Sequence, residues 1–259
     1  MKKLIVFCLI VFFSTQSCIG RVPEAKGIHT EERSFDSFDG IKVSKFLNAK
    51  VVKGDNYRVK VNVPQQYADY LTVEIDSENN LSIRIRSDIK KPKRGEKFEA
   101  EIICPSFDRI IVENLASVEV VSEYTFENIG LIARSLSSIS FKEHAKVSNN
   151  CQVEACVLSE VNLKLDAENL LAKSNSMSVI TVAGTAFIVG ANARDMAKIN
   201  CRKLNVKTAK VTARTMSEID VQADERFELS ASDMSRIRYA GAGEIVKMHA
   251  GNMSTIWKK

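Results

Sequence analysis

The C-terminal part of the chain, residues 112–259, repeats one nine-residue pattern eight times. The pattern runs small, any, usually polar, Leu or Met, small, any, Ile or Val, any, apolar. Its Leu or Met positions lie 18 to 22 residues apart, at Leu115, Leu136, Leu158, Met177, Met196, Met216, Met234 and Met253. Self-similarity at a fixed period near twenty residues is the signature of a solenoid, in which each coil stacks on the next.

The spacing of apolar residues inside each copy favours strands over helices. The Ile or Val position and the next apolar position are two apart, as in Ile219 and Val221, and period two is the strand signature. A coil of about twenty residues closes on itself through short strands and tight turns. The sequence therefore predicts an all-β fold, a single-stranded β-helix or β-solenoid with coils of about 20 residues.

Each row of the repeat has an expected place in the coil. We expect the Ile or Val row to point inward and the small residue, often Ala, to sit where the backbone enters a bend. The polar residue before Leu or Met suits a turn, because Asn, Asp and Ser side chains bond to nearby backbone. Methionines at 177, 196, 216, 234 and 253 could suggest a ligand or redox surface. We interpret this row as packing in core gaps or in the turns.

Residues 33–111 are also rich in strands but do not repeat regularly. Alternating apolar and charged residues, as in 57–63 and 81–86, indicate half-exposed strands. The segment Phe38-Asp39-Gly40-Ile41 resembles Phe107-Asp108-Arg109-Ile110 further along. We infer that the solenoid begins near Ile41. Residues 57–104 then elaborate an early coil or form a cap that protects the N-terminal edge.

The first residues have the three-part pattern of a secretory signal peptide. Lys2 and Lys3 precede ten apolar residues, 4–13, and small and polar residues follow to residue 17. The apolar run is too short to cross a bilayer as a helix. We predict a signal peptide over 1–17 and a flexible linker over 18–32. Cys18 is a lipidation candidate; ordinary cleavage nearby, with Cys18 incidental, is the alternative.

Export leaves several destinations open. A lipid on Cys18 would tether the domain to a membrane without inserting it. We expect an outer-membrane or cell-surface lipoprotein, or a periplasmic or secreted protein. The remaining cysteines outside the leader are Cys104, Cys151, Cys156 and Cys201, which allow three disulfide pairings in an oxidising compartment. Because Cys201 falls on an apolar row, we favour buried thiols.

Charge and titratable residues exclude some function classes. The net charge is +5, of which Lys2 and Lys3 contribute two, so the mature chain carries +3, too dispersed for nucleic acid. We interpret the basic cluster at 90–94 as a solvated loop. No spacing of His, Cys or acidic residues predicts a metal site, a cofactor or a catalytic residue. His29, His144 and His249 are far apart in repeat phase.

A carbohydrate-active β-helix enzyme, a polysaccharide lyase or glycosidase, is the alternative that the acidic residues raise. By strand parity Glu160, Glu218 and Asp220 face outward. However, the row through the repeat mixes signs, and it reads Glu160, Val179, Lys198, Glu218 and Arg236. Cross-coil charge pairs on a solvated face explain such a row better than a cluster of carboxylates.

The order of these motifs resembles the GIN-domain family, also described as putative auto-transporter adhesin heads of secreted Bacteroidetes proteins. The resemblance rests on Phe38-Asp39-Gly40-Ile41, the Gly54-Asp55 turn, the alternating strands to Arg86 and the Met-Ser-x-Ile ladder, and it covers residues 33–256. It implies a right-handed β-helix-like fold outside the cytoplasm.

The functional expectation is therefore a non-catalytic, exported, adhesin-like binding or structural module. Its partner would be a surface glycan or a protein, and its ligand-binding residues are not predicted. Self-association is also possible, because the C-terminal coil edge would present an open strand that invites pairing.

Overall fold

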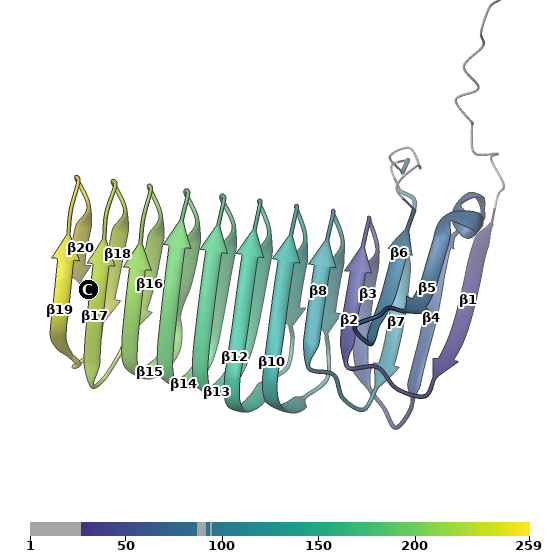
Figure 1. The fold of residues 1–259 in the computed structure, drawn as a ribbon, viewed down its shortest axis with the longest axis horizontal. Helices are drawn as coiled ribbons and strands as arrows, with labels where there is room; N and C mark the ends of the chain where they lie inside the picture. The colour runs from purple at the N-terminus through teal and green to yellow at the C-terminus, as the bar shows by residue number, and fades with distance from the viewer. Residues whose placement is uncertain (1–26, 87–91, 94) are drawn as a thin grey trace, which may run out of the picture.

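The computed structural model describes residues 27–86, 92–93 and 95–259, and these form the predicted β-solenoid (Figure 1). Strands make up 68% of the structure and helix 3%. The predicted signal peptide over 1–17 and the lipidation candidate Cys18 lie outside the described residues. Within those residues, no helix is long and apolar enough to cross a membrane.

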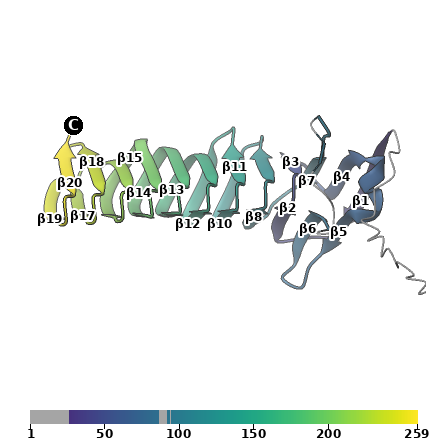
Figure 2. The same ribbon diagram turned by 90° about the horizontal axis from the view of Figure 1, so that it is seen from above.

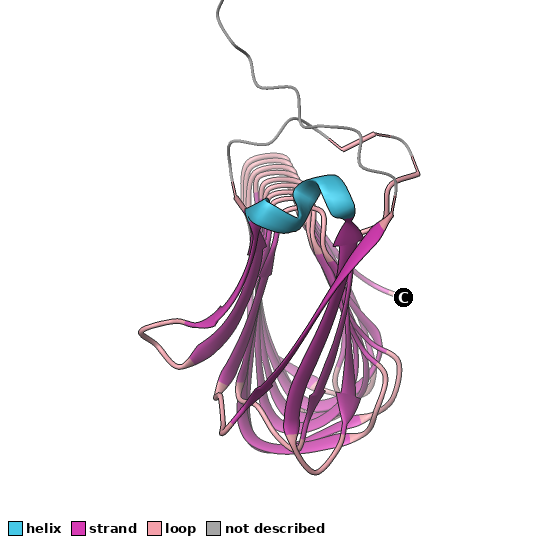
Figure 3. Cartoon of the chain, turned by 90° about the vertical axis from the view of Figure 1, so that its right-hand side faces the viewer, coloured by secondary structure: helices cyan, strands magenta, loops and turns pink. Residues whose placement is uncertain are grey.

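Each coil consists of two walls joined at a tight tip along one edge and at a wider bend along the other (Figure 3). In Figure 1 the chain rises along the near wall, turns at the tip, and descends the far wall while advancing to the left, which is a right-handed coil. Wall A denotes the strands that run into the tips. Wall B denotes the strands that leave them. Neighbouring coils pair in parallel in both walls.

The strands divide cleanly between the walls. Wall A contains β2 (Gly40–Ser44), β8 (Arg109–Glu113), β10 (Tyr124–Arg134), β12 (Ala145–Cys156), β17 (Arg226–Ala231) and β19 (Glu244–Ala250). Wall B contains β3 (Asn48–Lys53), β9 (Ser117–Val120), β11 (Ser138–Phe141), β16 (Glu218–Gln222), β18 (Arg236–Ala240) and β20 (Thr255–Lys258). Three long strands start in wall B, curve round the bend and end in wall A: β13 (Glu160–Asn175), β14 (Val179–Arg194) and β15 (Lys198–Ala213).

The predicted inward row is confirmed. Each Ile or Val of the repeat pairs in register with that of the next coil, as Ile180 does with Ile199 and Ile219 with Ile237, and these four side chains are fully buried. The small residue before the tip is also buried in the six coils from Ala133 to Ala231, and Ala213 has no exposed surface, whereas Ala250 in the last coil is exposed. A continuous aliphatic ladder therefore fills the space between the walls.

The solenoid begins at β2, as predicted near Ile41. β2 pairs in parallel with β8, and β3 pairs with β9, so residues 40–53 form a first coil. Residues 57–104 then add strands to the N-terminal side of both walls, where the molecule broadens (Figure 2). These are β4 (Tyr57–Pro64), the 3-10 helix η1 (Gln65–Tyr70), β5 (Leu71–Ile75), β6 (Asn80–Ile85) and β7 (Glu99–Cys104).

The added strands extend the walls by different pairings. β7 joins β3 in parallel, and β4 then pairs antiparallel with β7, which extends wall B. β6 joins β2 in parallel and β5 pairs antiparallel with β6, which extends wall A. η1 crosses between the walls at the tip edge (Figure 3). The segment is thus both an elaboration and a cap, with the aromatic rings of Tyr67 and Phe98 packed 5.0 Å apart at its core.

The flexible linker predicted over 18–32 is wrong from Ile28 onward. Residues Ile28–Phe35 form β1, which pairs antiparallel with β4 along its whole length. The sequence IHTEERSF is short and polar and has no alternation of apolar residues that would predict a strand. It forms a strand because it pairs with β4. Ile28 lies opposite Pro64, the last residue of β4, and β1 therefore begins at the tip edge.

The Leu and Met row does not fill the core. In every tip of the repeat, two consecutive residues have positive φ, near 60°, and the Leu or Met is the second of the pair. Seven of these side chains are 47–54% exposed, and Met253 is 83% exposed. We call this row the tip ridge: Leu115, Leu136, Leu158, Met177, Met196, Met216, Met234 and Met253. The left-handed pair turns each side chain outward. The expectation that this row lies in the turns is therefore confirmed, and the expectation that it fills gaps in the core is wrong.

The cysteines of the described residues are free thiols. Cys104, Cys151 and Cys201 are buried on inward rows, and Cys156 is partly exposed. Burial in an apolar core raises the pKa of Cys201 to about 12 and that of Cys104 to about 11. These groups are packing residues in the structure, as the sequence favoured.

Candidate functional site

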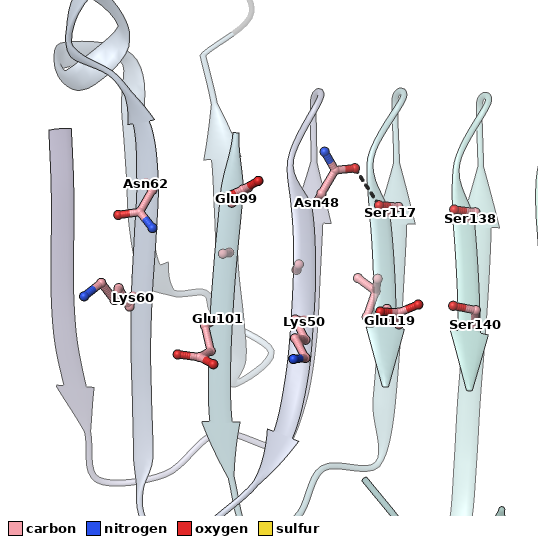
Figure 4. A pocket seen from close by; sticks show the side chains of 13 residues that line it. Asn48, Lys50, Lys60, Asn62, Glu99, Glu101, Ser117, Glu119, Ser138 and Ser140 are labelled. Atoms are coloured by element: carbon pink, nitrogen blue, oxygen red, sulfur yellow. Dashed lines mark hydrogen bonds between the residues drawn. The ribbon is translucent and has the colours of Figure 1, made fainter. Parts of the chain in front are cut away.

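A polar groove crosses the outer face of wall B where the N-terminal elaboration meets the regular coils (Figure 4). It has a volume of about 660 Å³, within the usual range for ligand sites. Five strands contribute to it, in the order β4, β7, β3, β9 and β11. The lining residues are Asn48, Ala49, Lys50, Lys60, Asn62, Glu99, Ala100, Glu101, Ser117, Val118, Glu119, Ser138 and Ser140.

Strand register arranges the polar lining in two straight rows. Side chains two apart on a strand share a face, and paired residues on adjacent strands lie side by side. The row nearer the tips carries amides, a carboxylate and hydroxyls: Asn62, Glu99, Asn48, Ser117 and Ser138. The second row alternates in charge before ending on a hydroxyl: Lys60, Glu101, Lys50, Glu119 and Ser140.

The hollow follows from the sizes of these side chains. Ser117, Ser138 and Ser140 are short, so the face is low on the solenoid side, whereas Lys60 and Glu101 stand higher on the elaborated side. Between the rows the floor contains Ala49 and Ala100, each only 4% exposed. Their side chains point inward to the core, so the backbone of β3 and β7 forms the floor of the groove there.

The rim charges of the second row are already paired. The Lys60 ammonium nitrogen lies 2.8 Å from a carboxylate oxygen of Glu32 on β1. This hydrogen bond holds the pKa of Glu32 below its usual value. At the opposite rim, Lys142 lies 2.8 Å from Glu119. Both rims are therefore neutralised within the protein.

The central charges of the groove are not engaged in this way. Among the residues that the structure describes, neither Lys50 nor Glu101 has a hydrogen bond or an ion pair from its side chain. The two are paired in register on β3 and β7, so their side chains point to the same side of the wall (Figure 4). A cation and an anion at the centre are thus available to an external group.

The first row supplies oriented hydrogen-bonding groups. Ser117 donates its hydroxyl to Asn48 Oδ1 at 2.7 Å, and Thr30 donates to Asn62 Oδ1 at 2.8 Å. Both bonds fix the amide orientation and leave the amide NH₂ groups directed elsewhere. The lining contains no aromatic ring. The groove is therefore suited to recognition by hydrogen bonds and charge, not by stacking.

The mixed-charge row predicted from the repeat lies further along the same wall. Its register is confirmed, since Glu160, Val179, Lys198, Glu218 and Arg236 are successive partners across five coils. Lys198 and Glu218 form an ion pair of 3.0 Å. Glu160 instead accepts a hydrogen bond from Asn162 on its own strand, and the row lines no part of the groove.

Asp220 is the exception to the predicted outward, exposed acids. It lies on the outer side of β16, yet it is only 1% exposed. Arg202 contacts it at 2.9 Å and Arg238 at 2.6 Å. The guanidinium groups of the two flanking coils cover the carboxylate, which strand parity alone does not anticipate. This cluster is a charge clamp between three coils.

No metal centre is found within the described residues, where His, Cys, Asp and Glu nowhere gather in threes in a geometry that could hold an ion. His29 lies on β1, His144 follows β11 and His249 lies on β19, so the structure brings no two of them together. His144 instead lies 3.4 Å from Asp166. The lipidation candidate Cys18 precedes the described residues.

The groove itself was not predicted from the sequence. Eight of its thirteen residues come from β3, β4 and β7, which lie outside the repeat, and antiparallel β4 is inserted beside parallel β7. The available signal was the recurrence of polar residues two apart, as in Lys60 and Asn62 or Glu99 and Glu101. That pattern indicates an exposed strand face but not which strands become neighbours.

Comparison with known families gives one match. The family described as "Putative auto-transporter adhesin, head GIN domain" matches residues 37–243, which include every lining residue of the groove. No curated protein sequence matches this chain.

Several solved structures share the fold. A putative adhesin from Parabacteroides merdae is 14% identical, with a TM-score of 0.80 over 90% of this chain and 96% of the other. A putative adhesin from Parabacteroides distasonis is 17% identical, with a TM-score of 0.72 over 91% and 98% of the two chains. A putative lipid binding protein from the same species is also 17% identical, with a TM-score of 0.66 over 90% and 96%. At these identities the structures show a common fold.

Proposed function

Since this chain belongs to the putative auto-transporter adhesin head, GIN-domain family, we propose that it is an exported, non-catalytic binding module and that the wall B groove is its ligand site. The ligand class that fits the lining is a polar, polyhydroxylated molecule, as a surface glycan is. Amides, carboxylates, hydroxyls and an ammonium group together donate and accept hydrogen bonds along two rows.

One observation carries this proposal. The charges at both rims of the groove are satisfied by internal ion pairs, whereas Lys50 and Glu101 at its centre have no partner in the described part of the chain. If these charges served only to hold neighbouring strands together, the central residues would form ion pairs as well, as Lys198 and Glu218 do further along the wall. Hydrogen bonds to charged groups are the stronger ones, so this pair is the natural anchor for sugar hydroxyls.

The carbohydrate-active enzyme is the competing function. A glycosidase needs one carboxyl group that keeps its proton, usually in an apolar pocket, and a second carboxylate facing it across the scissile bond. Glu99 and Glu101 stand side by side on one strand in an open, polar groove, and Glu101 lies between two lysines in register. This arrangement supports binding. The names of the family and of its structural relatives also favour a binding role.

The relative named as a putative lipid binding protein raises an apolar ligand as another possibility. An acyl chain needs an apolar channel, whereas ten of the thirteen groove residues are polar or charged. We therefore assign a polar ligand to the groove. For cellular location, we propose an envelope-anchored lipoprotein with lipid on Cys18, consistent with an adhesin-related family.

The test is a glycan array and a host-matrix protein panel probed with the mature chain. Glu101→Gln removes the central negative charge at the same side-chain length, and Lys50→Met removes the ammonium group while it keeps an unbranched apolar side chain of similar length. Lys198→Met and Glu218→Gln are matched controls, because they change the same residue types on the same wall outside the groove. We expect binding by the wild type and by the controls, and loss of binding in the groove variants. Equal binding by all four variants, or turnover of a bound glycan, would contradict the proposal.

A further inference from the structure

The tip ridge is a long apolar row on the surface of the described part of the chain. Eight Leu and Met side chains follow one another in single file along the tip edge, and each exposes about half of its surface or more. Successive coils are one strand spacing apart, about 4.8 Å, so the row from Leu115 to Met253 is about 34 Å long. Continuous exposed apolar surface of this extent in a folded domain usually marks an interaction site.

Turn geometry does not require these side chains. Both residues of each tip have positive φ, where Gly or Asn costs least and a large side chain costs about 1–2 kcal/mol. The tips are held together by backbone bonds between coils, as from the Met196 amide to the Thr215 carbonyl at 2.9 Å. Any residue supplies that amide. Large apolar residues thus occupy strained positions without reaching the core.

The size of the ridge argues against a protein partner as its occupant. A stable protein interface takes about 20–30 residues from each side, arranged as a broad patch. The ridge offers eight residues in a line. A lipid surface makes no demand for shape complementarity, and amphipathic elements bind it by placing apolar side chains about 5–10 Å into the boundary between head groups and acyl chains.

The path of the chain brings the same edge towards a membrane anchor. β4 ends at the tip edge with Pro64, and β1 begins opposite it at Ile28. Cys18, the lipidation candidate, precedes Gly27 by nine residues, which span at most about 30 Å. An anchor at Cys18 therefore joins the domain at its tip edge, because β1 begins there, and the tether lets that edge reach the bilayer.

We propose that the tip ridge rests on the lipid bilayer and orients the tethered solenoid with its long axis along the membrane. Docking then leaves both walls upright, and the wall B groove opens sideways, parallel to the membrane. The charged residues in and just before the tips have both signs: Lys45, Glu113, Arg134, Arg194, Asp195, Arg214 and Asp233. Because these charges nearly balance, docking depends on the apolar row and occurs on zwitterionic lipid.

The experiment tethers the mature chain to phosphatidylcholine vesicles through an N-terminal histidine tag and a nickel-chelating lipid, in place of the anchor. Met216→Trp reports on the ridge and Asp224→Trp on the opposite bend edge, both in a Trp257→Phe background. Brominated phosphatidylcholine quenches tryptophan that enters the acyl region. We expect Met216→Trp to lose most of its emission and Asp224→Trp to retain it. Equal quenching at both edges, or at neither, overturns the proposal.

A ridge variant separates docking from structure. Met177→Asn, Met196→Asn and Met234→Asn together remove apolar surface, while Asn tolerates positive φ and preserves the turns. We expect the triple variant to keep its melting temperature and to lose the quenching of Met216→Trp. Quenching that persists in the folded triple variant overturns the proposal. So does a wild-type dimer in sedimentation that the triple variant abolishes, because the ridge would then bind a second copy.

Discussion

Arg238 binds both carboxylate oxygens of Asp220, with Nε 2.6 Å from Oδ1 and Nη2 2.7 Å from Oδ2. Their Cα positions are paired in register on β16 and β18, so the bond joins two successive coils. The indole ring of Trp257, one coil further, lies 5.9 Å from the guanidinium. Four coils, counting Arg202 on β15, are therefore linked on the outer face of wall B.

We predict that Arg238→Ala destabilises the fold by about 2 kcal/mol, because it leaves a buried carboxylate with Arg202 as its remaining cation. Urea unfolding measures the change. Arg236→Ala, an exposed arginine on the same strand, is the control and should cost less than about 0.5 kcal/mol. The double variant Asp220→Ala with Arg238→Ala should cost less than the sum of the two single changes. Additive costs would show that the pair is not coupled.

The tips provide a second prediction, about backbone strain. Met216 has φ of 57°, where a β-branched side chain is strongly disfavoured and Asn is tolerated. We expect Met216→Val to lower the free energy of unfolding by about 1–2 kcal/mol and Met216→Asn to change it by less than about 0.5 kcal/mol. Both follow from denaturant titration. A larger loss for Asn than for Val would mean that apolar stacking along the ridge outweighs the strain.

The buried thiols predict a dependence of stability on alkaline pH. Burial raises the pKa of Cys201 from 9.0 to about 12, so the native state keeps the proton that the unfolded chain releases. The corresponding stabilisation is fully present below pH 9 and is lost as the pH rises from 9 towards 12, by about 1.4 kcal/mol per pH unit.

The measurement compares wild type with Cys201→Ala by chemical denaturation at pH 8, 9 and 10. The stability advantage of the wild type should shrink between pH 9 and 10. Cys151, with a pKa of about 12, should behave in the same way in Cys151→Ala. In the native chain without Cys18, a thiol reagent at pH 8 should label Cys156 rapidly and the three buried cysteines only after unfolding. Rapid labelling of Cys201 would contradict its burial.

Self-association through the C-terminal coil edge remains a proposal. Among the strands that the structure describes, β19 pairs with β17 alone, and its side chains, including Val246 and Met248, are exposed along the whole strand. We expect Val246→Lys to weaken a dimer, because it places charge at the edge of the strand pairing. Sedimentation at high concentration measures the dimer, with Lys247→Gln as a control that leaves the apolar edge intact. A wild type that stays monomeric disproves this proposal.

The sequence by itself determined the coil. A pattern repeated eight times carries both the strand period and the coil length, so it predicts which residues stack on which. The inward ladder through Ile199 and Ile219 follows, as does the row that pairs Lys198 with Glu218. The start of the solenoid near Ile41 was also predictable, because its first strand resembles the start of the repeat.

Only the tertiary structure decided the groove, the burial of Asp220 and the exposure of the tip ridge. The groove depends on which strands outside the repeat become neighbours. Lys50 lies beside Glu101 because β3 pairs with β7, a long-range pairing that no local pattern encodes. Asp220 is buried because arginines of two other coils reach over it. Met216 points outward because a left-handed pair of residues turns it away from the core. In each case the surroundings of the side chain depend on its three-dimensional neighbours and on turn geometry. The spacing of apolar residues and their strand propensity predict only the local backbone conformation.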